Sequence, residues 1–141
     1  MAEKSILLEI VTPEKTVVSE ETQMVVAPGT LGEFGVLTGH TPFLTTLKMG
    51  SLRYTDSSGA ERMVFIGGGF AEALPDKVTV LAESAERRRD IDIERARSAL
   101  ERAQKRLAEE AKKSEMDYTR AKAALERALY RLKLAESRRS Q

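Results

Sequence analysis

Hydrophobic and polar residues alternate over the first part of the chain. Ile6, Leu8 and Ile10 are separated by Leu7 and Glu9, and a period of two is typical of a strand with one buried face. Short apolar and β-branched runs then recur about every eight to twelve residues. They span 16–18, 22–27, 44–47, 51–55, 62–66, 70–74 and 78–82. This pattern predicts an all-β N-terminal domain, a small flattened antiparallel β-sandwich or barrel.

Turn-forming residues separate these runs. The polar segment Asp56–Gly59 predicts a hairpin between the runs at 51–55 and 62–66. The three consecutive glycines Gly67–Gly69 are predicted to interrupt the chain before the run at 70–74.

The period changes after Glu86. Apolar residues now recur at intervals of three and four, which is typical of amphipathic helices. They are Ala96, Leu100, Ala103, Leu107 and Ala111, then Tyr118, Ala121, Leu125, Ala128, Leu132 and Ala135. Asp90 is the predicted N-cap of the first helix, and Ser114 marks the start of the second. The short link at 112–115 predicts an antiparallel two-helix hairpin.

Composition places a boundary at the same point. All nine glycines and all four prolines lie at or before Pro75. Residues 1–86 hold 12 acidic and 6 basic side chains, whereas residues 87–141 hold 10 acidic and 17 basic ones, so the halves carry net charges of −6 and +7. The predicted domains are therefore a β-sandwich at 1–86 and a basic α-helical hairpin at 87–141.

The seam of the predicted hairpin alternates alanine with leucine. Alanine removes little apolar area from water, so a hairpin of this kind is marginal by itself and needs the sandwich or a partner as support. Two hypotheses follow: the hairpin switches between two supporting surfaces, or it stays permanently docked on one.

Composition also excludes several classes of protein. The chain has no cysteine and one histidine, which excludes disulfides and the common zinc sites. No basic segment precedes a long apolar run, and no stretch approaches the roughly 20 apolar residues of a membrane span. We expect a soluble protein of a reducing compartment, with an acidic partner, a phosphate ligand or nucleic acid facing the basic hairpin.

The segment Gly29–Gly50 contains five of the nine glycines and the single histidine, His40. Its glycines and apolar residues predict a rigid docking surface or a tight β corner. His40 is either a turn histidine bonded to nearby backbone or a polar contact.

An enzyme with His40 as general base and Gly67–Gly69 as a phosphate loop is disfavoured, because no Lys-Ser or Lys-Thr follows the glycines and a strand follows instead of a helix. Nucleic-acid binding is disfavoured because the helical charges alternate in sign and no aromatic platform accompanies them.

Five segments match a known family in order. They are Val11–Glu14, Gly32–Pro42, Gly68–Phe70, Val80–Glu83 and Ile91–Ala96. With a helical hairpin behind them, the chain resembles the ε subunit of F-type ATP synthases over its whole length. The resemblance implies a sandwich of about ten strands followed by two helices. It also implies a non-catalytic subunit of a proton-translocating ATP synthase, placed in the central rotor stalk.

The resemblance names partners and roles. The partners are the γ subunit, the c ring and the catalytic α and β subunits, with no nucleic acid. The subunit couples γ to the c ring, and its helical hairpin inhibits ATP hydrolysis when it extends along γ. The resemblance implies a position at the cytoplasmic face of the bacterial inner membrane, peripheral through the complex, with the stromal face of the plastid thylakoid as the alternative.

The resemblance also carries over three sets of residues. The candidate contacts to the c ring or γ are Glu33, Phe34, Val36, His40, Thr41 and Pro42. A regulatory ATP site, on a motif of Ile, Asp, two variable positions, Arg and Ala, comprises Glu86, Ile91, Asp92, Arg95, Ala96, Arg102, Arg127 and Arg131. The candidate contacts to the β subunit are Arg102, Lys105, Arg106, Lys112, Lys113, Arg120 and Lys122.

The ATP site has a simpler alternative. Arginine forks suit phosphate oxygens, and antiparallel packing is expected to bring Arg127 and Arg131 toward Asp92 and Arg95. In the alternative, Asp92 only supports the helix start and the arginines form a solvated basic face. ATP would be a regulatory ligand and no cofactor would be required; no residue is predicted to be catalytic or to bind metal.

Overall fold

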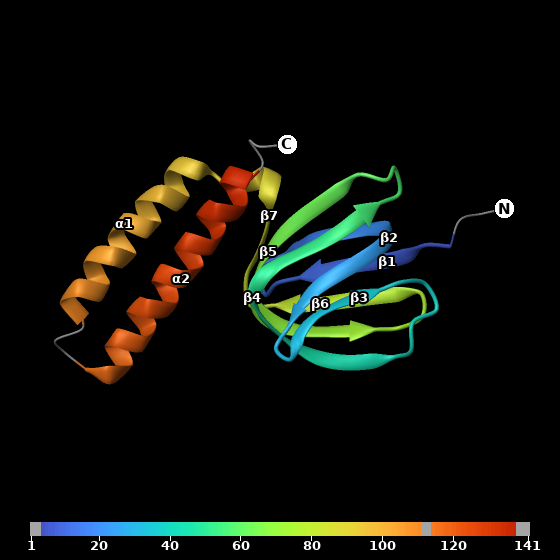
Figure 1. Ribbon diagram of the computed structural model, residues 1–141, viewed down its shortest axis with the longest axis horizontal. Coiled ribbons are helices and arrows are strands. Elements are labelled where there is room, and N and C mark those ends of the chain that lie inside the picture. Colours follow the sequence, from blue (N-terminus) through green and yellow to red (C-terminus); the bar gives the residue numbers. More distant parts are fainter. Residues whose placement is uncertain (1–3, 111–113, 138–141) are drawn as a thin grey trace. The chain divides into compact units, whose positions relative to one another are not determined.

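The computed structural model describes residues 4–110 and 114–137. The chain folds as two compact units, of which the first ends at Arg87 and the second begins at Arg88 (Figure 1). The first unit is built from β-strands and the second from a two-helix hairpin, which confirms the predicted fold class. The division lies one residue beyond the predicted boundary, because Arg87 ends the last strand and bonds to the sheet.

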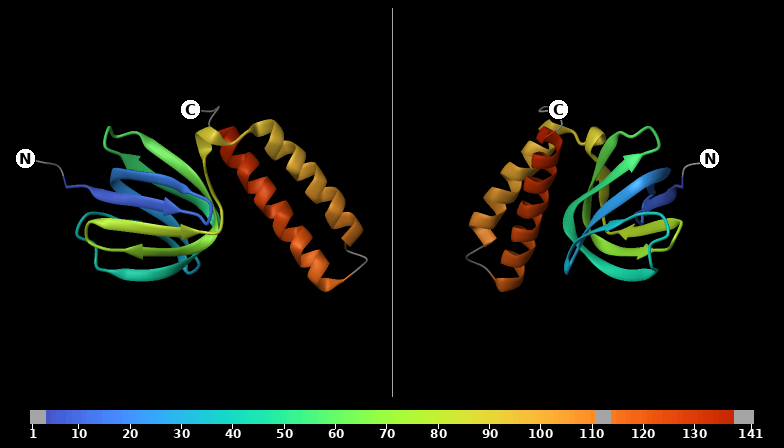
Figure 2. Two further views of the ribbon diagram at one scale, coloured as in Figure 1. Left: turned by 180° about the vertical axis from the view of Figure 1, so that it is seen from behind. Right: turned by 45° about the vertical axis from the view of Figure 1, so that its right-hand side comes forward.

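Seven strands form one sheet in the described part of the first unit. They are β1 (Ile6–Val11), β2 (Thr16–Gly29), β3 (Gly32–Val36), β4 (Phe43–Asp56), β5 (Glu61–Ala73), β6 (Lys77–Ala82) and β7 (Ala85–Arg87). Their order is β1-β6-β5-β4-β2-β3, and β7 pairs with β5. A further β1–β2 pairing closes the sheet into a flattened ring, seen from two other sides in Figure 2. All pairs are antiparallel except β1 with β6, which is parallel.

The expected ten strands are wrong in number because neighbouring runs fuse. The runs at 16–18 and 22–27 join into β2, those at 44–47 and 51–55 into β4, and those at 62–66 and 70–74 into β5. Each of these long strands continues without a break through the point where it leaves one neighbouring strand and pairs with another. The hairpin at Asp56–Gly59 is confirmed, since β4 and β5 pair on either side of it.

The glycines Gly67–Gly69 continue β5 instead of interrupting it. Gly69 pairs with Leu47 on one side and with Ala82 on the other. Its φ is 144°, and a Cβ at this position would overlap the carbonyl oxygen of Leu81. Glycine is needed here because the strand bends while β6 approaches closely.

The core lies inside the ring of strands. Ile6, Leu8 and Ile10 of β1 are fully buried, as their alternation predicts. The largest fully buried side chains of this core include Tyr54 and Leu52. Burial of each large aliphatic side chain contributes about 1.5–3 kcal/mol, so this unit has an apolar core of its own.

The second unit contains a 3-10 turn at Arg88–Asp90 and the helices α1 (Ile93–Glu110) and α2 (Glu115–Ser137). Figure 2 shows the two helices running side by side. Their seam is alanine-rich, and the buried alanines are Ala96, Ala103, Ala121, Ala128 and Ala135. Neither described helix is long and apolar enough to cross a membrane.

The N-cap of α1 is Asp92 and not Asp90. Asp92 Oδ1 accepts a hydrogen bond from the Arg95 amide at 3.1 Å, whereas Asp90 belongs to the preceding 3-10 turn. The N-cap of α2 is Ser114 as predicted: its Oγ accepts from the Asp117 amide at 3.1 Å and donates to Asp117 Oδ2 at 2.7 Å. Both caps satisfy amide groups that a helix leaves unpaired at its start.

Candidate functional site

The predicted docking segment forms β3 and the loop that joins it to β4. β3 lies at the end of the strand order, and Glu33 projects from it into solvent. Glu33 Oε1 accepts a hydrogen bond from Arg53 Nη2 at 2.8 Å. Thr41 and Pro42 are exposed in the loop. Glu33, Thr41 and Pro42 are therefore all accessible, on β3 and on its loop.

Two aromatic contacts hold this loop in place. The rings of Phe34 and Phe43 meet edge to face with centroids 5.1 Å apart, and the His40 ring lies 5.1 Å from that of Phe43. Phe34 is half-buried and also packs against the core. Such edge contacts contribute about 0.5–1.5 kcal/mol beyond area burial, so they fix the loop against the sheet.

His40 is bonded to nearby backbone. Its Nδ1 lies 2.7 Å from the Thr41 carbonyl oxygen, which can only accept, so Nδ1 carries the proton. The His40 amide also donates to the Leu37 carbonyl at 3.1 Å. His40 is therefore a turn histidine, which is one of the two alternatives that the sequence left open. Its ring remains half-exposed beside Thr41.

Val36 is the exception among the predicted contacts. It is fully buried in the core of the first unit, so it supports β3 from inside and contributes nothing to the exposed surface. The inward direction follows from the pleat, because Glu33 and Val36 lie on opposite faces of the strand.

The second candidate site is a cleft between α1 and α2, of about 210 Å³. Four arginines and four alanines line it: Arg102, Arg106, Arg127 and Arg131, with Ala99, Ala103, Ala124 and Ala128. We call it the arginine cleft. No carboxylate occurs among these eight described residues.

The helix register explains which residues meet there. Arg97 forms ion pairs with Glu94 at 2.9 Å and with Glu136 at 3.5 Å. An antiparallel pair that places residue 97 opposite 136 places 102 opposite 131 and 106 opposite 127. Arg127 and Arg131 therefore meet Arg102 and Arg106, and the expected meeting with Asp92 and Arg95 does not occur in the cleft lining.

The remaining members of the predicted ATP site lie elsewhere. Asp92 caps α1, and Ile91 and Ala96 are buried. Arg95 is exposed near the start of α1. Glu86 lies in β7, where it pairs with Phe65, and belongs to the first unit.

The basic residues assigned to the β subunit divide into three groups. Arg102 and Arg106 line the arginine cleft, and Lys105, Arg120 and Lys122 are exposed on the helices. Lys112 and Lys113 lie outside the described residues. Arg106 is therefore a cleft residue that the motif did not include, and only the register of the helices reveals it.

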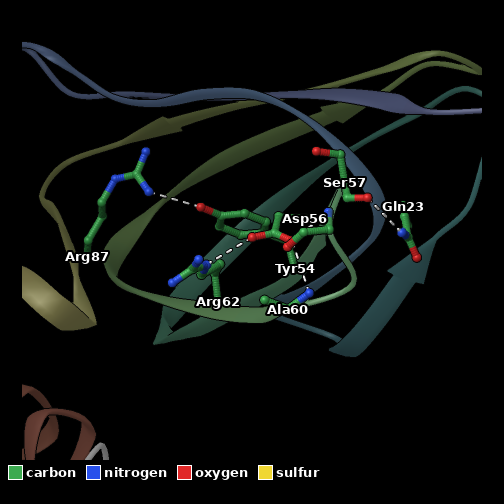
Figure 3. A network of polar contacts seen from close by, with 8 residues as sticks. Gln23, Tyr54, Asp56, Ser57, Ala60, Arg62 and Arg87 are labelled. Carbon is green, nitrogen blue, oxygen red and sulfur yellow. Dashed lines mark hydrogen bonds and ion pairs between the residues drawn. The ribbon is translucent and has the colours of Figure 1, made fainter.

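Polar contacts surround the hairpin turn between β4 and β5 and involve Arg87 of the last strand, β7 (Figure 3). Asp56 accepts hydrogen bonds from Ser58, Ala60 and Arg62, and the Ser58 hydroxyl contributes most to holding the pKa of Asp56 at about 2. Arg87 Nη1 donates to the Tyr54 hydroxyl at 3.1 Å, and Arg87 Nε donates to the Val17 carbonyl at 3.1 Å. These contacts fix the hairpin turn and the last strand.

An apolar groove on the first unit was not predicted. It has a volume of about 350 Å³, and Phe70 and Leu81, which pair across β5 and β6, are both exposed beside Val11 and Pro13. The only sequence signal for it is that both side chains are large and apolar on the outer face of their strands. No cluster of three or more metal-ligating side chains occurs within residues 4–110 and 114–137.

Comparison with known proteins covers both units. The family model described as the ATP synthase, Delta/Epsilon chain, beta-sandwich domain matches residues 5–88, and the one described as the long alpha-helix domain matches residues 89–136. The ATP synthase epsilon chain of Desulfatibacillum aliphaticivorans is 67% identical over 135 residues, covering 96% of this chain and 94% of the relative. That of Carboxydothermus hydrogenoformans is 52% identical over 108 residues, covering 77% of this chain and 79% of the relative.

Two solved structures are also similar. A chain of the Euglena gracilis mitochondrial ATP synthase, in a structure of OSCP, F1 and c-ring, has a TM-score of 0.72 at 25% identity and covers 89% of this chain and 78% of its own length. A chain of the Tetrahymena thermophila mitochondrial ATP synthase has a TM-score of 0.56 at 11% identity, covering 96% of this chain and 99% of its own length, and shows a shared fold.

Proposed function

Because the chain belongs to the ATP synthase delta/epsilon chain family, as an epsilon chain, we propose that it is a non-catalytic central-stalk subunit that couples γ to the c ring. The observation that carries this proposal is 67% identity to an epsilon chain over 96% of the sequence, spanning both structural units. The similarity to a chain of an F1 and c-ring assembly supports the same partners: γ, the c ring and the α and β subunits.

The test is reconstitution of a complex that lacks this subunit. Adding the purified chain should restore ATP-driven ion pumping to complexes whose ATP hydrolysis is otherwise uncoupled. Hydrolysis that stays uncoupled after the chain has bound would reject the coupling role.

The surface of β3 and its loop is the proposed contact to the c ring. Glu33 supplies an exposed carboxylate, and the aromatic contacts of His40 and Phe34 with Phe43 hold the loop rigid. A rigid surface loses little conformational entropy on binding, which favours a stable rotor contact. We propose that the subunit lies at the cytoplasmic face of the bacterial inner membrane, peripheral through the complex; the similarity to epsilon chains supports its place in the complex.

The helical hairpin is the proposed inhibitory element. Its alanine seam buries little apolar area, and Lys105, Arg120 and Lys122 are exposed cations suited to an acidic partner. A chain that ends after Arg87 should still assemble and should raise ATP hydrolysis by the complex. Unchanged hydrolysis would reject inhibition by the hairpin.

ATP is the proposed regulatory ligand of the folded hairpin. The arginine cleft joins α1 to α2, so an anion bound there stabilises the folded hairpin by mass action, about 2.7 kcal/mol at a ligand concentration 100 times Kd. Replacement of Arg127 by Gln should abolish the thermal shift that ATP induces in the isolated chain. An equal shift in variant and parent would remove the cleft from the site.

A further inference from the structure

The last strand of the first unit is short. β7 contains three residues, Ala85–Arg87, and pairs with β5. All three residues are half-buried. A short segment at the end of a folded unit opens locally with ease, because few backbone hydrogen bonds hold it. The attachment of β7 to the sheet therefore depends strongly on its side-chain contacts.

Arg87 supplies contacts to two further strands. Its Nε donates to the Val17 carbonyl of β2, and its Nη1 donates to the Tyr54 hydroxyl of β4, both at 3.1 Å. Figure 3 shows the guanidinium directed at this hydroxyl. Tyr54 is 1% exposed and also bonds to the Glu20 side chain. Because hydrogen bonds from a charged donor are stronger than neutral ones, the Arg87 side chain ties β7 firmly to β2 and β4.

Beyond Arg87 the chain belongs to the hairpin. None of the three residues in the 3-10 turn Arg88–Asp90 is buried. The Arg88 carbonyl accepts a hydrogen bond from the Ile91 amide at 3.3 Å, and the turn lies against α2. The division between the two units falls between Arg87 and Arg88. One residue therefore ends the sandwich, and the next begins the hairpin.

We propose that Arg87 is a positioning residue that fixes the pivot of the hairpin: when the hairpin moves relative to the sandwich, the chain turns at the junction of Arg87 and Arg88, and β7 stays on the sheet. The inference rests on the proposed inhibitory hairpin and specifies where that element is attached. Release of β7 would add up to about 10 Å of loose chain at 85–87. Those residues would lose their freedom again whenever both of their ends are held, which weakens inhibition.

The first experiment locks β7 to β5 with a disulfide. The Gly67 amide donates to the Ser84 carbonyl at 2.8 Å, so the next pair along the two strands is not hydrogen-bonded. That pair is Ile66 with Ala85, and the Cα atoms of such a pair lie about 4.5 Å apart. Disulfides span Cα separations of about 4.4–6.8 Å. The chain has no cysteine, so Ile66→Cys with Ala85→Cys introduces its only thiols.

ATP hydrolysis is then measured in complexes assembled with the oxidised chain, with the same chain in its reduced form, or with fragment 1–87, which gives the rate without a hairpin. The oxidised and reduced chains should inhibit equally, because β7 does not move. Loss of inhibition in the oxidised form alone would place the pivot within β7 and overturn the inference, while leaving the inhibitory hairpin standing. Equal rates with the fragment and with the full parent chain would reject the inhibitory hairpin, and the pivot with it.

The second experiment releases β7 by removing its side-chain anchor. Arg87→Gln should weaken inhibition about fivefold, the ordering cost of about one backbone residue. It should also speed hydrogen exchange of the amides at 85–87 and leave that of β1 unchanged. Arg62→Gln removes the same charge from a surface ion pair of the same unit and should behave as the parent.

The disulfide between positions 66 and 85 separates positioning from folding. In the oxidised form, a chain that carries Arg87→Gln together with the cysteine pair should regain the inhibition of the parent, because the disulfide replaces the anchor. Reduction should remove this gain. Full inhibition by Arg87→Gln alone, or no recovery on oxidation, would overturn the role of Arg87 as the anchor of the pivot.

Discussion

Arg53 reaches across a strand to hold Glu33. Glu33 lies on β3 and Arg53 on β4, with β2 between them, and the guanidinium Nη2 lies 2.8 Å from the carboxylate Oε1. Both side chains are partly exposed, at 39% for Arg53 and 56% for Glu33. A surface pair of this kind contributes about 0–1 kcal/mol to stability, so its main effect is to orient the carboxylate at the edge of the sheet.

A charge swap separates orientation from recognition. The double variant Glu33→Arg with Arg53→Glu keeps the ion pair but moves the carboxylate from β3 to β4. Its free energy of unfolding should stay within about 1 kcal/mol of the parent, while coupling of ATP hydrolysis to ion pumping should be lost. Arg62→Gln, at another surface ion pair of the same unit, is the control. Normal pumping by the swapped chain would show that Glu33 does not contact the ring.

Whether a truncated chain ends at Glu86 or at Arg87 should change its stability. Arg87 bonds to Val17 and to the buried Tyr54, so a chain ending at Glu86 leaves the Tyr54 hydroxyl without this donor. Fragment 1–87 should exceed fragment 1–86 in stability by about 1–3 kcal/mol, the usual cost of removing one partner of a buried polar group. Urea unfolding of both fragments measures the difference, and coincident midpoints would contradict it.

Asp92 offers a test of the cap against ligand binding. Asparagine caps a helix about as well as aspartate, so Asp92→Asn should lose only the favourable charge at the helix N-terminus, about 0.3–1 kcal/mol. Asp92→Ala should lose about 1 kcal/mol more. If Asp92 serves only as a cap, both variants retain the thermal shift with ATP measured from their own baselines. A shift lost in Asp92→Asn would assign the carboxylate to the ligand.

Local patterns predicted most elements but not where one strand ends. The period of two buries Ile6, Leu8 and Ile10, and the three-and-four period identifies the buried alanines of the hairpin. The predicted interruption at Gly67–Gly69 is wrong because glycine occurs both where a strand ends and where a strand bends. Only the close approach of β6 distinguishes the two cases. Likewise Asp90 and Asp92 are equally good caps by residue type, and the 3-10 turn at Arg88–Asp90 selects Asp92.

The positions of the site residues depend on how the elements pack against each other. The sequence pattern indicates this packing less directly than it indicates the elements themselves. The motif at Ile91–Ala96 predicts a site at the start of α1. The cleft forms further along the helix, because the register set by Arg97 and Glu136 brings Arg106 opposite Arg127. On β3, the alternation of a strand places Val36 on the face opposite Glu33, and Val36 is buried there, so the motif match predicts its exposure wrongly.

Gly69 should tolerate no side chain. Its φ of 144° strains any other residue, and a Cβ would overlap the Leu81 carbonyl oxygen. Gly69→Ala should cost about 2–4 kcal/mol. Gly35→Ala is the matched control, because the nearest atoms to a Cβ there lie at 3.9 Å, and it should cost less than about 1 kcal/mol. Equal unfolding midpoints for the two variants would contradict the close approach of β5 and β6.

Tyr54 should make the first unit sensitive to alkali. Burial contributes most, and the Glu20 carboxylate next, to raising the pKa of Tyr54 from 10.0 to about 12, while Arg87 acts in the opposite sense. The folded chain thus holds the phenol proton more tightly than the unfolded chain does. The resulting stabilisation is complete below pH about 10 and is lost as the pH rises from about 10 to about 12.

The measurement is the free energy of unfolding between pH 8 and 12.5, for the parent and for Tyr54→Phe. All other ionisable groups are the same in both chains, so the difference between the two curves isolates Tyr54. The parent should lose more stability than the variant between about pH 10 and 12. Parallel curves over this interval would show that the Tyr54 phenol titrates in the folded chain as it does in the unfolded one, and that its bonds to Arg87 and Glu20 do not restrain its proton.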